Sequence, residues 1–290
     1  MYVAVRECHL PGLFGSIKAG LDAMSIDAVE LEYFRDRSVL SLDAVDGAKE
    51  SLADEAATDS FAYKCSGLKC RVAALLLHNN LGAEDIDSEV DWVTSCVKAA
   101  GRLGVTAVRI DAIMSTERDW PLDKRIQRFA DCMSKVLDST TDMGVDLGIE
   151  NHGVQGNDPQ FLDTVLEKVG SPRLGITIDT GNFYWAGNPL SRVHEIIRHF
   201  APKVKHTHIK SINYPKDKRE IKREVGWEYG TYASSLPDGD IDIKMVVEAL
   251  GKSGYKGSLC IENESLGRLS ELERKQALID DAAYLRGMIS

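Results

Sequence analysis

Apolar positions along the chain alternate between short runs with β-strand character and longer stretches with helical periodicity. Such a pair of segments recurs eight times. The predicted strands cover residues 2–5, 28–34, 72–77, 107–113, 146–150, 175–179, 204–210 and 258–262. The predicted helices cover residues 13–24, 44–57, 88–103, 123–143, 159–169, 189–200, 243–253 and 269–286. This alternation is typical of α/β proteins whose parallel strands are joined by helical crossovers.

Residues that favour helix ends occur where the predicted helices begin and stop. Asp158 followed by Pro159 is typical of an N-cap and a first helical position. Glycines stand where helices should end before a strand, at Gly104, Gly144, Gly170 and Gly254. With eight repeats the sheet can close on itself, so we expect an α/β fold of the (β/α)8 TIM-barrel type. We expect residues 1–290 to form a single domain of this type.

A doubly wound open sheet is the alternative architecture for the same alternation of elements. The chain contains no G-x-G-x-x-G and no G-x-x-x-x-G-K-[ST] sequence. Those sequences are typical of nucleotide-binding open sheets, so their absence favours the closed barrel.

Composition restricts the kinds of partner. The chain has 43% hydrophobic and 28% charged residues, as in ordinary globular proteins, and a net charge of -10. An acidic protein repels a polyanionic backbone, so we expect a small-molecule substrate and no nucleic acid. No apolar segment approaches the ~20 residues of a membrane span. We therefore expect no membrane association. The sequence leaves the oligomeric state open, a homo-oligomer included.

The beginning of the chain and its cysteines favour a cytoplasmic location. Arg6 and Glu7 stand where the apolar core of a secretory signal would lie. The six cysteines are scattered and form no C-x-x-C pair. A dense disulfide framework is typical of small secreted domains, so these cysteines indicate a reducing compartment.

One connection, residues 211–242, is longer than most. It contains the charged run 215–224, followed by the aromatic residues Trp227, Tyr229 and Tyr232. Loops that follow strands of a barrel form its active site, so this connection is either a lid or a solvated insertion. Basic residues in the run could reach a phosphate, but interleaved acidic residues favour a solvated face.

Several of the later strands end in ionisable residues where an apolar residue is usual. Glu150 ends the fifth strand, Asp179 the sixth and Glu262 the eighth. The seventh strand contains H-T-H-I-K, in which a period of two places His206, His208 and Lys210 on one face. If that face is the interior, three carboxylates and one imidazole converge at the mouth of the barrel. The period does not distinguish His206 from His208.

Converging carboxylates require a positive charge between them. Three such groups would repel each other by several kcal/mol at low dielectric, and a divalent cation is the simplest compensation. Three oxygen ligands and one nitrogen ligand suit Mn²⁺, Mg²⁺ or Co²⁺, and Zn²⁺ also fits. The sequence therefore predicts a site for one divalent metal ion.

The residues at these strand ends resemble the xylose isomerase-like TIM-barrel superfamily, in particular the sugar phosphate isomerase/epimerase group. This group includes inosose isomerases, inosose dehydratases and ketose 3-epimerases. The similarity begins near Ala28 and is most specific in GIENHG at 148–153, GITIDTGNF at 175–183 and VKHTHIK at 204–210. It continues through LPDGDIDIKMVVEALGKSGYKGSLCIENE at 236–264.

The resemblance implies roles for individual residues. It implies metal ligands at Glu150, Asp179, His208 and Glu262, and so favours His208 over His206. It also implies that Glu150 and Glu262 are the acid/base pair of a sugar or cyclic-polyol isomerase or epimerase, which transfers a proton through a metal-stabilised enediolate. Manganese-dependent carbohydrate metabolism is the corresponding expectation.

The chain departs from the ketose 3-epimerases at two places. Asn182 stands where they have a histidine, and residues 211–215 contain no arginine where they have one. These differences weaken that particular assignment and leave the metal site unaffected. Predicted substrate contacts are His152, Asn182, Lys210, Glu32 and His78, with Asn79 and Asp111 as further candidates. Alternatively, Glu32 pairs with an arginine and His78 is a core histidine.

Three other functions compete with an isomerase. A lyase or dehydratase acting on an inosose or 3-keto-sugar would use the same metal ligands and the same first proton transfer. An apurinic endonuclease-like barrel needs more histidines, including one at the position of Asn182. A non-catalytic barrel would not need all four metal ligands.

Overall fold

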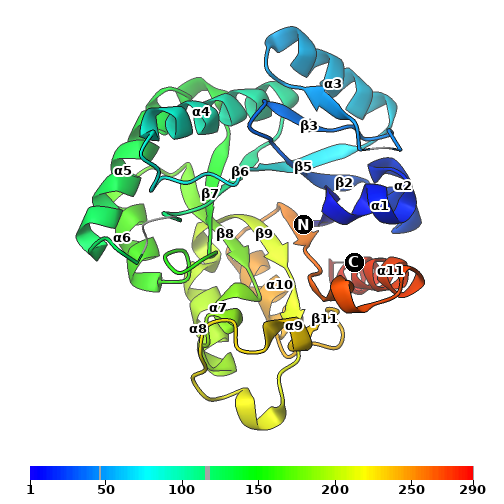
Figure 1. The fold of residues 1–290 in the computed structure, drawn as a ribbon, viewed down its shortest axis with the longest axis vertical. Coiled ribbons are helices and arrows are strands. Elements are labelled where there is room, and N and C mark those ends of the chain that lie inside the picture. Colours follow the sequence, from blue (N-terminus) through cyan, green and yellow to red (C-terminus); the bar gives the residue numbers. More distant parts are fainter. Residues whose placement is uncertain (46, 115–117, 290) are drawn as a thin grey trace.

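The computed structural model describes residues 1–45, 47–114 and 118–289, and its central feature is a closed barrel of eight parallel strands (Figure 1). The barrel strands are β1 (Tyr2–Arg6), β2 (Ala28–Glu32), β5 (Arg71–Leu76), β6 (Ala107–Ile110), β7 (Asp146–Glu150), β8 (Leu174–Asp179), β9 (Val204–Ile209) and β12 (Ser258–Ile261). Neighbours in the chain are neighbours in the barrel, and β12 pairs with β1 to close it. The predicted barrel is confirmed, and the open sheet is excluded.

Helices surround the strands on the outside of the barrel (Figure 1). They are α1 (Leu10–Phe14), α2 (Ile17–Ala23), α3 (Glu55–Gly67), α4 (Ile86–Leu103), α5 (Leu122–Asp138), α6 (Pro159–Val169), α7 (Asn182–Trp185), α8 (Leu190–Phe200), α9 (Tyr229–Tyr232), α10 (Ile243–Lys252) and α11 (Glu271–Ile289). Short 3₁₀ turns are η1 (Glu7–His9), η2 (Thr141–Met143), η3 (Ala201–Lys203), η4 (Lys216–Lys218) and η5 (Ser265–Arg268). In residues 1–45, 47–114 and 118–289, no helix has the length and apolar character to cross a bilayer.

Helix α6 begins and ends as its sequence predicts. The Asp158 side chain accepts a hydrogen bond from the Gln160 amide, and Pro159 occupies the first turn. Gly170 ends the helix at φ 63°, a left-handed conformation that costs little in glycine. Local capping chemistry is therefore enough to define this element.

The predicted helix at residues 44–57 is wrong. The chain there forms β4 (Lys49–Ser51), which pairs antiparallel with β3 (Ser38–Leu40), and α3 starts only at Glu55. Asp54 caps α3 by accepting a hydrogen bond from a backbone amide in its first turn. Gly47 has φ 70°, which no continuous helix allows, and position 46 lies outside the described residues.

The predicted helix at residues 13–24 is divided in two. Gly15, at φ 90°, ends α1, and the Ser16 side chain caps α2 by accepting from the Ala19 amide. A glycine followed by a serine provides both a stop and a new start, which outweighs the continuous apolar pattern.

The two faces of the barrel wall differ in composition. Outward-facing residues such as Ile149, Ile178 and Ile261 are fully buried in the main core, between strands and helices. The inner face has a small separate cluster of Ala4, Ala28, Ala73 and Cys260. Side chains alternate between the two faces of a strand. The inward-facing positions that follow these small residues toward the C-terminal ends of the strands therefore point into the mouth of the barrel.

The long connection at 211–242 is held against the barrel. It contains β10 (Ser211–Ile212) and β11 (Ala233–Ser234), which pair antiparallel. The buried Arg223 guanidinium donates to the carbonyls of Tyr184 and Asn188 at 3.1 and 2.9 Å. It also lies 4.5 Å from the Tyr184 ring and 4.4 Å from that of Tyr214. The segment is therefore not simply a solvated insertion, and Arg223 is not free to bind a phosphate.

Candidate metal centre

Four ionisable side chains from the second half of the chain meet inside the mouth of the barrel. Glu150 and Asp179 end β7 and β8, His208 lies on β9, and Glu262 directly follows β12. All four are buried, and one donor atom from each lies within 4.8 Å of all the others. The structure thus brings together the four residues predicted as metal ligands, while metal binding itself stays a prediction.

The two histidines of the H-x-H sequence occupy different levels of the barrel. His208 Nδ1 lies 3.3 Å from Glu150 Oε1 and 3.7 Å from Glu262 Oε2. His206 instead places Nε2 2.9 Å from Glu30 Oε1 and Nδ1 3.2 Å from Ser258 Oγ. Periodicity alone did not decide which of the two histidines lies with the predicted carboxylate ligands. In the structure, His208 is the one that does.

One buried nitrogen of this cluster has unused bonding capacity. Among the described residues, His208 Nδ1 has no hydrogen-bond partner, and the carboxylate oxygens of Glu150 and Glu262 lie 3.3 and 3.7 Å from it. Buried polar atoms are nearly always paired, so a nitrogen that faces two carboxylates in this way is suited to a cation. The donor set of three carboxylates and one imidazole also fits a divalent metal ion.

The protein provides part of the compensating charge itself. Lys210 Nζ lies 3.0 Å from Asp179 Oδ2, 3.1 Å from Glu262 Oε2 and 3.2 Å from Glu264 Oε2. Arg109 forms a buried ion pair with Glu150. The positive charge expected among the carboxylates is thus provided in part by the chain itself, and the divalent metal ion stays a prediction.

The carboxylates of the site outnumber the lysine and arginine side chains that contact them. Among the described residues, the acidic clusters contain the five carboxylates Glu30, Asp111, Glu150, Asp179 and Glu262. The cations in contact with them are Arg6, Arg109 and Lys210, and Lys210 also contacts Glu264. Burial raises the pKa of Asp179, and the neighbouring carboxylates raise that of His208, so protons balance part of the charge when no metal ion is bound. A divalent metal ion would take over this role, because buried charge is costly unless it is balanced.

Each of the two predicted acid/base glutamates is held by one arginine. Arg109 binds Glu150 through Oε2, which leaves Oε1 facing His208. Arg6 binds Glu262 through Oε1, which leaves Oε2 facing Lys210. Sequence reasoning missed both arginines, although a charged residue in the apolar runs YVAVR and AVRI was a signal for them.

The arginines help to keep both glutamates ionised. Burial alone would raise the pKa of the Glu150 carboxyl, but the charges of Arg109 and His208 outweigh it and hold the pKa below its usual value. Burial likewise opposes ionisation of Glu262, and Lys210 and His208 hold its pKa well below the usual value. For Asp179 burial dominates and raises the pKa, although Lys210 opposes it.

The predicted substrate contacts divide into two groups. His152, Asn182 and Lys210 lie beside the cluster: Asn182 Nδ2 donates to Glu150 Oε1 at 3.2 Å, and His152 Nδ1 lies 2.8 Å from Asp111 Oδ1. The hydrogen bond with Asp111 raises the pKa of His152 above its usual value. All three contacts stay predictions.

Glu32 and His78 do not belong to the cluster of four donor residues. His78 Nε2 lies 3.8 Å from Glu32 Oε2, its Nδ1 lies 3.8 Å from Asp111 Oδ2, and its side chain is 48% exposed. Glu32 therefore faces a histidine rather than the arginine considered from sequence, and His78 is not a core histidine. Asn79 is structural, since it bonds both backbone groups of Asp111.

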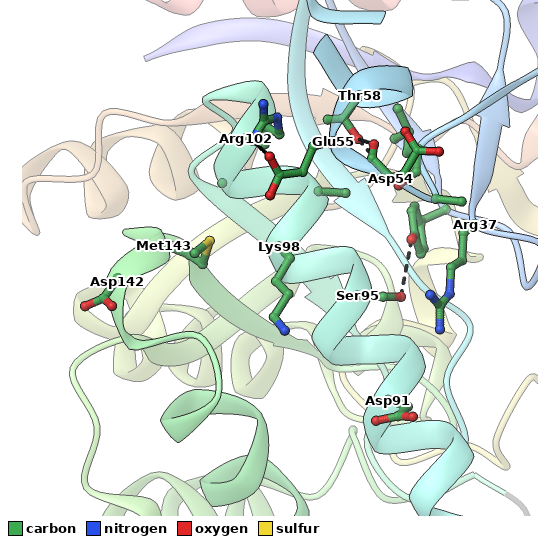
Figure 2. Close-up of a pocket in the computed structure, with 15 residues that line it drawn as sticks. Arg37, Asp54, Glu55, Thr58, Asp91, Ser95, Lys98, Arg102, Asp142 and Met143 are labelled. Carbon is green, nitrogen blue, oxygen red and sulfur yellow. Dashed lines mark hydrogen bonds and ion pairs between the residues drawn. The ribbon is translucent and has the colours of Figure 1, made fainter. Parts of the chain in front are cut away.

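Two cavities differ in their chemistry. One of about 200 Å³ lies beside Glu262 and Arg6, and it is also lined by Cys8, His9 and Glu264. Figure 2 shows another, of about 680 Å³, outside the barrel between α3, α4 and η2. There Arg102 is already paired with Glu55 and Asp59. The smaller cavity is the one that adjoins the candidate metal centre.

The fold and the cluster define a TIM barrel with an acidic site at its mouth. The profile of the family described as "Xylose isomerase-like TIM barrel" matches residues 19–288, and the chain belongs to this family. The predicted family is confirmed. Family membership covers barrels with different chemistries, so the reaction has to be argued from the site.

Curated relatives match over part of their length. An inosose dehydratase of Geobacillus thermodenitrificans is 24% identical over 155 residues, covering 51% of this chain and 48% of that protein. An inosose dehydratase of Serratia proteamaculans is 26% identical over 161 residues, 51% of each chain. The uncharacterized protein MJ1311 of Methanocaldococcus jannaschii is 29% identical over 138 residues, with 46% and 42% covered. The chain spans about half the length of the curated relatives it matches.

Solved structures share the fold over nearly the whole chain. The IOLI protein with a bound zinc atom has a TM-score of 0.71 at 15% identity, covering 98% of each chain. The 3-keto-D-glucoside 4-epimerase YcjR of E. coli has a TM-score of 0.70 at 12% identity, covering 99% of each. An L-ribulose 3-epimerase has a TM-score of 0.68 at 18% identity, covering 100% of this chain and 93% of that one.

Proposed function

We propose that this protein is a divalent-metal-dependent isomerase or epimerase that acts on a sugar or cyclic polyol. The observation that carries the proposal is the convergence of Glu150, Asp179, His208 and Glu262 within 4.8 Å at the mouth of the barrel. A bound divalent ion there would polarise a carbonyl and acidify the neighbouring C–H bond. Family membership and the named activities of relatives support the same class of substrate.

Glu150 and Glu262 are the groups that move the proton. They reach the cluster from β7 and from the end of β12, with β8 and β9 between them, so they approach a substrate from different sides. A base must be ionised to accept a proton, and the lowered pKa of each glutamate keeps it in that form at neutral pH. One glutamate removes the proton, and the other returns one to the opposite face or the adjacent carbon.

Lys210 stabilises the negative charge that develops on the substrate. Burial would lower the pKa of its ammonium group, but Asp179 and Glu262 outweigh burial and keep it charged. A fixed positive charge near the reacting carbonyl stabilises an enediolate without solvent reorganisation. Tyr229 bonds Glu264, which contacts Lys210, so the 211–242 segment helps to orient this charge.

A lyase that expels water is the second candidate. Besides the inosose dehydratase relatives, the His152–Asp111 pair favours it. His152 has a raised pKa and shares a cluster of donor atoms with Glu150, so it can protonate a departing hydroxyl group. An isomerase needs no such acid for a leaving group.

Metal analysis combined with proton exchange tests the proposal. The purified protein is analysed for bound metal and incubated in D₂O with ketoses, inososes and 3-keto-glycosides, each with Mn²⁺, Mg²⁺, Co²⁺ or Zn²⁺. We expect about one metal ion per chain and deuterium at the carbon next to the carbonyl. A product of unchanged mass supports the isomerase, and loss of water supports the lyase. Absence of both metal binding and exchange would contradict metal-dependent proton transfer.

A further inference from the structure

Glu30 lies directly beneath the candidate metal centre and had no role in the prediction from sequence. It comes from β2, on the other half of the barrel, and its side chain is fully buried. Its Oε2 accepts a hydrogen bond from His208 Nε2 at 2.8 Å. Its Oε1 lies 2.9 Å from His206 Nε2. One carboxylate thus connects both histidines of the H-x-H sequence.

This contact determines which nitrogen of His208 is available. A neutral imidazole has one N–H donor and one lone pair, and the partner of the donor decides which nitrogen carries the proton. In the neutral ring that binds a metal ion, Nε2 donates to Glu30 and the lone pair is on Nδ1, which faces Glu150 Oε1 at 3.3 Å. The opposite arrangement would point an N–H group at the carboxylates and leave no nitrogen ligand there.

His206 holds the carboxylate in turn. Its Nδ1 lies 3.2 Å from Ser258 Oγ, so both of its ring nitrogens have polar neighbours. Arg6 Nε lies 3.8 Å from Glu30 Oε2 and places positive charge nearby. Glu30 is therefore confined from several sides in the position where it meets His208.

We propose that Glu30 is a positioning residue that presents Nδ1 of His208 to a metal ion, and that His206 serves to orient Glu30. The inference rests on the proposed metal centre and extends it to residues outside the four ligands. Carboxylates that accept a hydrogen bond from a ligand histidine set its orientation and increase its basicity, and their loss costs roughly 10–100-fold in metal affinity.

The same atoms could alternatively form a second metal site. Donor atoms of Glu30, His206, His208 and Cys260 lie within 4.8 Å of one another. Oε2 of Glu30 is, however, already hydrogen-bonded to His208 Nε2, and Cys260 Sγ is 3.7 Å from the same oxygen. Oε1 lies 2.9 Å from His206 Nε2, although the two atoms do not have the geometry of a hydrogen bond. Such a site would also require both nitrogens of His208 to bind metal at once. Hydrogen bonding explains the arrangement with fewer requirements.

The test compares Glu30→Gln with Glu7→Gln. Glu7 is a matched control because it is another buried glutamate, and its Oε1 accepts from the Glu32 amide rather than from a histidine. Zn²⁺ affinity is measured by competition with a chromophoric chelator. We expect Glu30→Gln to bind Zn²⁺ about 10–100-fold more weakly, and Glu7→Gln to bind it like the wild type. Glu30→Asp, which keeps the charge, should recover part of the loss.

NMR of the zinc-loaded wild type gives a readout that requires no variant. Long-range ¹H–¹⁵N correlations should show His208 with metal on Nδ1 and a proton on Nε2. Metal on Nε2, or unchanged affinity in folded Glu30→Gln, would overturn the inference. So would a thiolate-to-cobalt charge-transfer band in the Co²⁺ form that is lost in Cys260→Ser, because it would show that Cys260 binds metal. A wild type that binds no metal would instead contradict the proposed function itself.

Discussion

The two halves of the barrel contribute different charges to its mouth. The second half, β7 to β12, provides the four converging donor residues together with Lys210, whereas the first half provides two arginines and a glutamate that hold three of the four. Arg6 on β1 binds Glu262, Glu30 on β2 binds His208, and Arg109 on β6 binds Glu150. Residues that could bind metal and residues that position them are thus separated along the chain and interleaved in space.

This division explains why the sequence revealed the predicted metal ligands but not the residues that position them. A ligand is recognised by its residue type at the end of a strand. A positioning residue is defined only by the atom that it touches across the barrel. Buried charges make the difference important, because removing one partner of a buried ion pair typically costs about 3–5 kcal/mol. The two halves should therefore respond differently to substitution.

Substitutions in the second half should act on turnover. Glu150→Gln and Glu262→Gln keep the size of the side chain and remove the proton acceptor, so kcat should fall roughly 10²–10⁴-fold with the fold intact. Deuterium exchange measures the loss, and far-ultraviolet circular dichroism verifies the fold. Wild-type turnover in either variant would contradict the acid/base assignment.

A substitution in the first half should act on stability. Arg109→Met leaves Glu150 and Asp111 without their shared guanidinium, so the free energy of unfolding should fall by about 3–5 kcal/mol. Urea denaturation measures this change. A divalent metal ion should restore more stability to this variant than to the wild type, because it replaces the missing positive charge. Equal stabilisation of both proteins would show that arginine and metal do not share a role.

Substitution of the two histidines distinguishes a predicted metal ligand from a positioning residue. His208→Ala removes a predicted ligand and should abolish metal binding in a calorimetric titration. His206→Ala removes only the residue that orients Glu30, so its metal affinity should fall by about 10-fold or less. Equal losses in the two variants would place both histidines in the same role.

The smallest effect is a change in the pH dependence of stability at Glu7. Burial raises the pKa of Glu7 to about 7 from 4.5, although Arg6 opposes it. Its folded form thus binds a proton more tightly than its unfolded form, so this group's contribution to stability is present below pH ~4.5 and is lost as the pH rises through ~7. As the pH rises from 5 to 8, the free energy of unfolding of the wild type should therefore fall by about 1–3 kcal/mol more than that of Glu7→Gln. Parallel pH profiles in urea denaturation would contradict the assignment.

Local patterns were sufficient for most of the fold. Helix α6 has its own cap, proline and terminal glycine, so sequence determines its bounds. The helix predicted at 44–57 was wrong because β4 forms by pairing with β3. The periodicity within one segment contains no information about its pairing partner. Tertiary pairing outweighs local preference in such short segments.

The sequence by itself determined the closed barrel and the three carboxylates that converge with a histidine of the H-x-H sequence, because periodicity and strand order are properties of the chain. The tertiary structure alone decided the partners. Glu30 and His208 are 178 positions apart, and Arg6 and Glu262 are 256 apart. They meet because β12 closes against β1, and only that closure brings a carboxylate of the first half under an imidazole of the second. The choice of His208 over His206 likewise depends on the depth of each ring in the barrel, which the period of two does not encode.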